Sequence, residues 1–174
     1  GQAFEAVVEL LHDGVNGSGH GDIARAPNGD VHIVYNAWDR NGWDKRRTGH
    51  RWRAVHVVRT QDGDWLPETH NWRSLGGDFG FSIAVDGRGV VHATGLDFET
   101  GPEARPDLQW CYFNNADRPD EMKPKWCAED HENITTAILL SPAGDVWLTR
   151  ASNSDRLARY VSYDASRKIW SEPQ

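Results

Sequence analysis

The sequence contains little methionine, little cysteine and no long apolar run. Its 174 residues include one Met and two Cys, and no apolar run approaches the ~18 residues that a membrane-spanning helix needs. Lys and Arg total 19 against 26 Asp and Glu, which gives a net charge of −7 with neutral His. A nucleic-acid partner requires a basic face that binds phosphates. We therefore expect no membrane partner and no nucleic-acid partner.

Metal and nucleotide motifs are also lacking. The eight His and two Cys include no close pair with the spacing of a zinc site. Asp62-Gly63-Asp64 is typical of a turn rather than of a calcium loop. The chain contains neither a phosphate-binding loop nor a dinucleotide fingerprint. We expect no metal and no cofactor.

Glycine and tryptophan are abundant, with 17 Gly and nine Trp. Glycine supplies the positive φ of tight turns, and aromatic residues favour pleated sheets, so this mixture predicts an all-β protein. The hydrophobic share of 38% is enough for a packed core. The length predicts one domain over residues 1–174.

A strand, a polar turn with Gly and a second strand recur three times. The copies are Ile23–Tyr35, Ile83–Gly95 and Ile138–Arg150, and their turn glycines are Gly29, Gly89 and Gly144. Third strands are expected at Arg53–Arg59, Leu108–Asn114 and Leu157–Tyr163, and fourth strands at Trp65, Trp126 and Trp170. Four strands repeated at a period near fifty residues indicate β-propeller blades.

We expect about three four-stranded antiparallel blades, at residues 20–72, 78–128 and 133–174, with an extra strand at 4–11. Each blade must bury its apolar faces against a neighbour, and propellers close with four to eight blades. The chain is then either a partial ring within a longer protein or one part of a ring closed by oligomerisation. Two copies forming a six-bladed ring are the simplest closure.

The repeats resemble a known family. An apolar strand, Pro or Asp followed by x-Gly, then Val-His and a second strand resembles the BNR (Asp-box-type) propellers, which include sialidases and polysaccharide lyases. Ser162 to Trp170 resembles a degenerate Asp-box, with Ser166 in place of Gly and Trp170 one position late. A shortened form stands at Asp62-Gly63-Asp64-Trp65. This resemblance implies carbohydrate recognition on the loop face of the propeller.

The resemblance to the ulvan-lyase members of this group implies a set of catalytic roles. In those enzymes a His, a Tyr and an Arg act on the proton next to a uronate carboxylate, which needs a base, an acid and a cation. Here His20 or His50 would be the base and Tyr112 the acid. The candidates for the carboxylate clamp are Arg51, Arg53 and Arg150. For His20, which lies in a Gly-rich stretch, a structural role is the alternative.

The loops also contain residue types that bind sugars. Trp rings cover the apolar face of a pyranose, and carboxylates accept hydrogen bonds from hydroxyls. The candidates are Trp38, Trp43, Asp22, Asp39, Asp78 and Asp97. A sialidase-type hydrolase fits less well than a lyase, because Arg25, Arg73 and Arg150 stand outside any sialidase motif. His32, His56 and His92 lie in strands, where hydrogen-bonded, partly buried histidines are expected.

A second resemblance leads to a different function. The segment from His131 to Tyr163 is similar to a WD-type blade, which implies a non-enzymatic protein-interaction scaffold. We rank this alternative behind carbohydrate recognition with polysaccharide-lyase or glycoside-hydrolase-like activity. The expected partner is then a poly- or oligosaccharide.

The two cysteines lie in neighbouring strands of the second blade. A hairpin around Arg118-Pro119-Asp120 puts Cys111 opposite Cys127. A cross-strand disulfide and a pair of buried thiols are both compatible with this pattern. A disulfide favours an oxidising compartment, so we expect an extracellular or periplasmic location.

Overall fold

The computed structural model describes residues 15–39, 52–67, 69–72, 81–97, 109–117, 123–129, 134–152 and 158–174. These residues form three four-stranded antiparallel sheets, each a simple meander in chain order. Blade 1 contains β1 (Val15–Arg25), β2 (Val31–Asp39), β3 (Trp52–Arg59) and β4 (Thr69–Trp72). Blade 2 contains β5 (Ser82–Val85), β6 (Val91–Asp97), β7 (Gln109–Asn114) and β8 (Lys123–Glu129). Blade 3 contains β9 (Ile134–Leu140), β10 (Val146–Ser152), β11 (Ala158–Asp164) and β12 (Ile169–Trp170).

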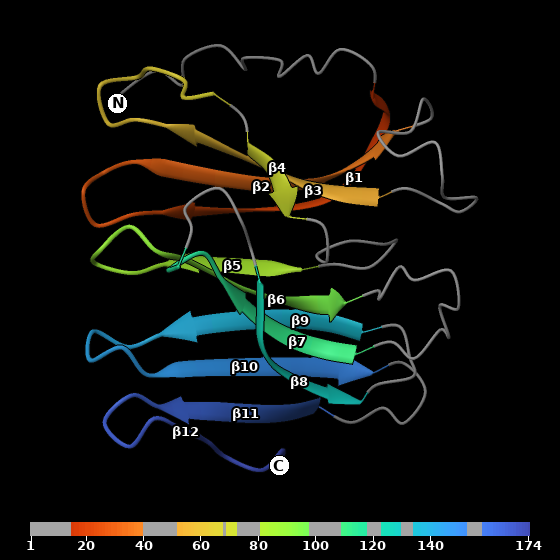
Figure 1. Cartoon of the computed structure of the whole chain (residues 1–174), viewed down its shortest axis with the longest axis vertical. Helices are drawn as coiled ribbons and strands as arrows, with labels where there is room; N and C mark the ends of the chain where they lie inside the picture. The colour runs from red at the N-terminus through yellow and green to blue at the C-terminus, as the bar shows by residue number, and fades with distance from the viewer. Residues whose placement is uncertain are drawn as a thin grey trace, which may run out of the picture.

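The blades follow one another along the long axis of the molecule (Figure 1). The first strand of blade 2, β5, contacts the first strands of both neighbouring blades, β1 and β9. The described residues therefore form an open stack of propeller-type blades and not a closed ring, which confirms the expected fold class. The expected extra strand at 4–11 lies outside the described residues.

The core lies between the blades. Between blades 1 and 2, Val34 packs with Ile83, Ala93 and Phe113. Between blades 2 and 3, a second cluster contains Trp110, Tyr112, Val146, Leu148 and Val161. Because side chains alternate across a strand, each blade has one face toward the preceding blade and one toward the following blade.

The fourth strand of blade 1 differs from the expectation. Trp126 and Trp170 lie in β8 and β12, as expected, but Trp65 forms only an isolated bridge with Arg59, and β4 begins at Thr69. Pro67 accounts for the interruption, since proline has no N–H for the ladder. The outer edge of blade 1 is therefore irregular.

The repeated turns share one geometry. In each, the glycine N–H donates to the carbonyl three residues earlier, and the glycine has a φ between 80° and 98°. The four glycines are Gly29, Gly63, Gly89 and Gly144. A type I turn followed by a left-handed residue is a common three-residue hairpin. Asp62-Gly63-Asp64 belongs to such a turn, as expected.

The hairpin that resembles an Asp-box is held by Asp164. Its Oδ1 accepts hydrogen bonds from the backbone N–H groups of Ser166 (2.9 Å) and Arg167 (3.0 Å). The left-handed residue is Lys168, with a φ of 58°, and Ser166 stands where the family pattern has Gly.

Cys111 and Cys127 are directly opposite each other on β7 and β8. They form a disulfide with an S–S distance of 1.98 Å and a Cα–Cα distance of 4.1 Å. Of the two alternatives left open by the sequence, the structure has the disulfide.

Candidate functional site

The blade ends form two opposite faces. We call the end with the β1–β2, β5–β6 and β9–β10 turns the turn face. The opposite end, where β1, β5 and β9 begin and β2, β6 and β10 end, is the loop face. Figure 1 shows the turn face on the left and the loop face on the right.

Four predicted positions share the loop edge of blade 1. In the strand register, Trp38 is opposite Trp52, Ala37 is opposite Arg53, and Asp39 is opposite Val15. His20 is part of β1, next to a point where the β1–β2 register shifts. The backbone thus brings His20, Trp38, Asp39 and Arg53 to one edge.

The other loop-face candidates are distributed differently. Asp97 ends β6 and pairs with Gln109 at the loop edge of blade 2. Four further candidates lie outside the described residues: Trp43, His50, Arg51 and Asp78.

Asp22 links two blades. Its Oδ2 accepts hydrogen bonds from Ser82 Oγ (2.9 Å) and from the Ile83 N–H (2.8 Å), both on β5. Its Oδ1 accepts from the Ile23 N–H at 2.8 Å. Both carboxylate oxygens therefore already have partners within the chain.

Tyr112 lies at the boundary between blades 2 and 3, in a chain of polar groups. Its hydroxyl is 2.6 Å from His92 Nδ1 and accepts a hydrogen bond from Asn114 Nδ2 at 3.1 Å. His92 Nε2 is 3.4 Å from Asp86 Oδ2. The tautomer that suits both neighbours has its proton on Nε2, so the Tyr112 hydroxyl donates to Nδ1.

Burial and hydrogen bonding determine the protonation states of Asp86, His92 and Tyr112. Burial alone would raise the pKa of Asp86, but hydrogen bonds from Arg88, Val90 and His92 lower it to about 2. Burial lowers the pKa of His92, against the opposing effect of Asp86. Burial raises the pKa of Tyr112 to about 12. At neutral pH, Asp86 is ionised, His92 is neutral and Tyr112 holds its proton.

These protonation states determine what chemistry Tyr112 and His92 can carry out. Burial raises the pKa of Tyr112 to about 12 and lowers the pKa of His92, so transfer of the Tyr112 proton to His92 is strongly unfavourable. The arrangement is suited to fixing ring positions and not to generating a phenolate. Tyr112 is the acid predicted from the sequence, and the proton that it would supply is shared with His92.

Arg150 lies at the same blade boundary as Tyr112 but against another ring. Its Cζ is 5.6 Å from the centre of the Trp110 ring, within cation–π range. Trp110 Nε1 donates to Thr94 Oγ1 at 2.9 Å. Tyr112 and Arg150 thus both lie at this boundary, where Tyr112 is nearer the turn face.

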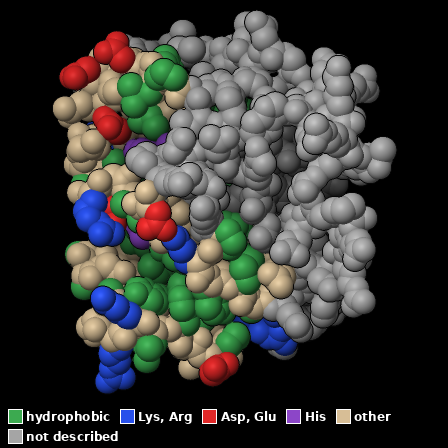
Figure 2. All heavy atoms as spheres, viewed as in Figure 1, with side chains coloured by type: hydrophobic (Ala, Val, Ile, Leu, Met, Phe, Trp, Pro, Cys, Tyr) green, Lys and Arg blue, Asp and Glu red, His purple; other side chains and the backbone are tan. Residues whose placement is uncertain are grey.

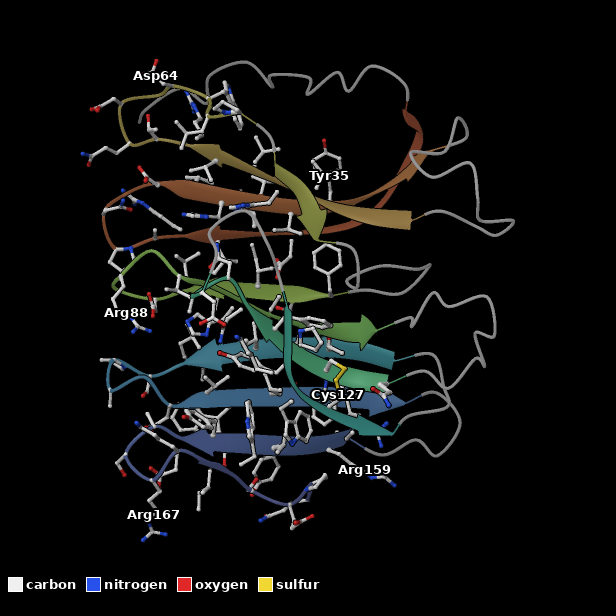
Figure 3. The ribbon with its side chains drawn as sticks, viewed as in Figure 1. Tyr35, Asp64, Arg88, Cys127, Arg159 and Arg167 are labelled. Carbon is white, nitrogen blue, oxygen red and sulfur yellow. A yellow bond between two sulfur atoms is a disulfide. The ribbon has the colours of Figure 1, made fainter. Side chains whose placement is uncertain are left out.

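A cleft of about 1010 Å³ opens on the turn face between blades 2 and 3. Its lining includes Tyr112, His92, Arg88, Tyr163 and Trp170. Figure 3 shows Arg88 projecting from the β5–β6 turn, and Figure 2 shows apolar side chains on this side of the molecule, bordered by basic ones. Arg88 is paired with Asp86 at 2.7 Å, and Tyr163 and Trp170 line the cleft as half-buried aromatic rings.

Blade 1 has a buried pair at the corresponding strand positions. His32 Nδ1 is 3.0 Å from His56 Nε2, and both rings are buried. Burial lowers the pKa of His56 to about 4, with a further contribution from His32. The expectation that His32, His56 and His92 are hydrogen-bonded strand residues is confirmed.

Sequence reasoning did not find the partners of these histidines. His32 and His92 each stand three residues after a turn glycine, so the repeat identifies them as equivalent. Their partners, His56 and Tyr112, come from the third strand and depend on a diagonal contact across the sheet. Apart from belonging to a turn, Asp86 and Arg88 showed no sequence pattern that would indicate a functional role.

Among the described residues, no group of three His, Cys, Asp or Glu side chains is arranged to hold a metal ion. A search of the same part of the chain finds no helix with the length and apolar character of a membrane span.

No protein-family model matches the chain, and no curated protein matches it. Solved structures match its fold. One is a protein of unknown function from Dyadobacter fermentans DSM 18053, with a TM-score of 0.56 and 11% identity over 91% of this chain and 50% of that one. Another is the Hadza microbial sialidase Hz136, with a TM-score of 0.56 and 12% identity over 91% of this chain and 37% of that one. The chain spans half or less of the length of these two proteins, and at these identities the likeness concerns the fold.

Proposed function

We propose that this chain is a propeller-type carbohydrate-binding domain that takes a saccharide at its loop face. The observation that carries the proposal is the strand register of blade 1, which gathers His20, Trp38, Asp39 and Arg53 at one edge. The fold likeness to a microbial sialidase supports a carbohydrate-related function.

The residue types at this edge suit an acidic sugar. An indole ring covers the apolar face of a pyranose, a carboxylate accepts hydrogen bonds from hydroxyls, and a guanidinium binds a sugar carboxylate with two parallel hydrogen bonds. Trp38, Asp39 and Arg53 provide one of each. We therefore expect uronate or sialylated saccharides to bind more tightly than neutral ones.

The finer part of the proposal is cleavage of a uronate polysaccharide by elimination. His20 or His50 would remove the proton next to the carboxylate, and Arg53 or Arg51 would neutralise that carboxylate. Because Tyr112 shares its proton with His92 at the boundary of blades 2 and 3, away from the loop edge of blade 1, the leaving oxygen would take its proton from another group or from water.

Calorimetric titration with defined oligosaccharides tests the binding step. The wild-type chain should bind a uronate or sialylated oligosaccharide, and Trp38→Ala, Asp39→Asn and Arg53→Ala should each weaken binding by about tenfold or more. Asp62→Asn and Arg167→Ala change exposed turn-face residues and serve as matched controls. Circular dichroism confirms that each variant is folded.

The proposal is overturned if no acidic or neutral saccharide binds, or if the three loop-edge variants bind like the controls. Elimination has its own readout, since the product contains a conjugated double bond that absorbs ultraviolet light. Absorbance that increases with uronate polysaccharide, and that is lost in His20→Ala or His50→Ala, supports a lyase. Binding without that increase restricts the function to recognition.

The disulfide bears on where this function is carried out. Cys111–Cys127 is a bond that persists in oxidising compartments and is rare in reducing ones. An extracellular or periplasmic location, where polysaccharides are encountered, is the location we propose.

A further inference from the structure

Each blade has one row of side chains toward the following blade, which we call the forward row. In every blade, the forward row contains one residue on the first strand and one on the second strand, each at a fixed distance in sequence from the turn glycine. Its third residue lies on the third strand, diagonally across the sheet. The forward rows are Ala24, His32 and His56 in blade 1, Ala84, His92 and Tyr112 in blade 2, and Leu139, Trp147 and Tyr160 in blade 3.

The opposite face of each blade has a backward row toward the preceding blade. These residues are paired directly across the strands. The backward rows are Ile23, Ile33 and Val57 in blade 1, Ile83, Ala93 and Phe113 in blade 2, and Ile138, Leu148 and Val161 in blade 3. Each row begins with an isoleucine six residues before the turn glycine.

Inside the stack, a backward row packs on a forward face. Ile83, Ala93 and Phe113 of blade 2 form one cluster with Val34 and Ala24 of blade 1. Leu148 and Val161 of blade 3 form another with Tyr112 and Trp110 of blade 2. The same geometry is therefore used at both internal blade boundaries.

Each end face of the stack has exposed apolar residues, but in the backward row of blade 1 only Ile23 is exposed, because Ile33 is half-buried and Val57 is buried with Tyr35 and Trp65 packed against it. In blade 3, Tyr160 is 45% exposed, whereas Tyr112 at the equivalent position of blade 2 is buried, and Leu139 is 65% exposed, whereas its equivalent Ala84 is half-buried. In blade 1, Ile23 is 63% exposed, whereas Ile83 is buried. The forward row of blade 3 is also more apolar than the other two, with Leu139 and Trp147 at the positions where they have Ala and His.

Charged residues on the two end faces of the stack are also complementary. Arg25 of blade 1 takes the backward position near the turn that Val85 and Leu140 take in blades 2 and 3, and it is exposed. On the forward face of blade 3, a hollow of about 570 Å³ is lined by Asp145, Trp147 and Asp164. At the internal boundary, Leu140 lines the corresponding cleft beside His92. A following blade 1 would bring Arg25 toward the two carboxylates.

We infer that a second copy of this chain covers these faces. The forward row of blade 3 packs on Ile23 and Ile33 of blade 1 in the other copy, and the reciprocal contact closes a six-bladed ring. We propose two copies because closed propellers have four to eight blades and the described residues of one copy form three. The ring has twofold symmetry, so one pair of surfaces makes both contacts.

Light scattering and sedimentation equilibrium measure this assembly directly. The expected mass is that of two 19.6 kDa chains. Leu139→Glu and Ile23→Glu put a charge into the contact at residues that are exposed in the single chain, so each should fold and weaken association by about tenfold or more. Leu66→Glu is the matched control, since Leu66 is also exposed but belongs to neither row.

Arg25 has a separate signature. Arg25→Glu would set a carboxylate against Asp145 and Asp164, so it should weaken association by about tenfold at low salt and by less at high salt, where charges are screened. Circular dichroism and Trp emission of each variant confirm the folded chain.

The inference is overturned if the wild-type chain has the mass of one copy up to about 100 μM. It is also overturned if Leu139→Glu and Ile23→Glu associate like Leu66→Glu. A mass that grows without limit contradicts the closed ring, because an end-to-end contact that does not close gives a filament.

Discussion

Asp22 on β1 and Ser82 on β5 are joined across the boundary of blades 1 and 2 by a 2.9 Å hydrogen bond, although they are 60 residues apart in the sequence. The same Asp22 oxygen accepts the backbone N–H of Ile83 at 2.8 Å. At the next boundary, Thr136 Oγ1 donates to the Thr94 carbonyl at 3.2 Å. Polar bonds of this kind fix how the blades are aligned, which apolar packing alone does not.

Asp22→Ala should therefore destabilise the stack. It leaves the Ile83 N–H and the Ser82 hydroxyl without their shared acceptor, and a lost hydrogen bond to a charged group costs about 1.5–3 kcal/mol. Urea unfolding measures the change, with Asp62→Asn on an exposed turn as control. An unchanged midpoint for Asp22→Ala would show that the interblade bond contributes nothing to stability.

Two glycines in one turn separate backbone conformation from space. A Cβ on either Gly87 or Gly89 meets nothing within 4 Å, but Gly89 has a φ of 80° and Gly87 has no positive φ. Gly89→Ala should cost about 1–2 kcal/mol, because an L-residue resists the left-handed region. Gly87→Ala should be neutral or slightly stabilising. Equal unfolding midpoints for the two variants would contradict this account.

Stability should fall as the pH drops from about 7 to 4. Burial and His32 lower the pKa of His56 to about 4 from 6.5, so within this window the unfolded chain binds a proton that the folded chain does not. The unfolded state gains accordingly, by up to roughly 3 kcal/mol for His56 at about 1.4 kcal/mol per unit. His32 and His92 act in the same direction.

His56→Gln tests which group is responsible. Glutamine keeps a hydrogen-bonding side chain but does not titrate, so urea unfolding from pH 7 to 4 should have a shallower pH slope than wild type. Asp86 adds little in this window, since its stabilising contribution is lost only as the pH falls from 3.8 toward about 2. A variant slope equal to that of wild type would assign the effect elsewhere.

The Cys111–Cys127 disulfide should stabilise blade 2. The two residues are 16 apart in sequence, and closing a loop of that length in the unfolded chain is worth about 3 kcal/mol. A reductant should therefore lower the unfolding midpoint of the wild-type chain. The double variant Cys111→Ala with Cys127→Ala should be insensitive to reductant, and a wild type equally insensitive would contradict the expected contribution.

Much of the fold was predictable because its signals are local. The turn glycines, the apolar strands around them and the spacing between repeats indicated the hairpins and the blades. The expected third strand Arg53–Arg59 became β3 at Trp52–Arg59, and the position of Cys111 opposite Cys127 followed from a hairpin. Trp65 failed as a fourth-strand marker because Pro67, which has no N–H for the ladder, interrupts the pairing after the isolated Arg59–Trp65 bridge, and β4 begins only at Thr69.

The functional groups were less predictable. The sequence indicated Tyr112 as an acid and Asp22 as a sugar ligand, but neither His92 nor Ser82 could be recognised as their partners. One contact is a diagonal across two strands, and the other joins separate blades. Such contacts depend on register and stacking, which one-dimensional spacing does not contain.

The sequence by itself determined the all-β repeat, because hairpin turns and alternating strands are specified by residues next to one another in the chain. Only the tertiary structure decided which polar groups are occupied and which apolar rows are exposed. Leu139 and Ile83 have similar hydrophobicity, yet one is exposed and the other is buried. The difference is whether another blade covers the row, and burial is a property of the whole stack.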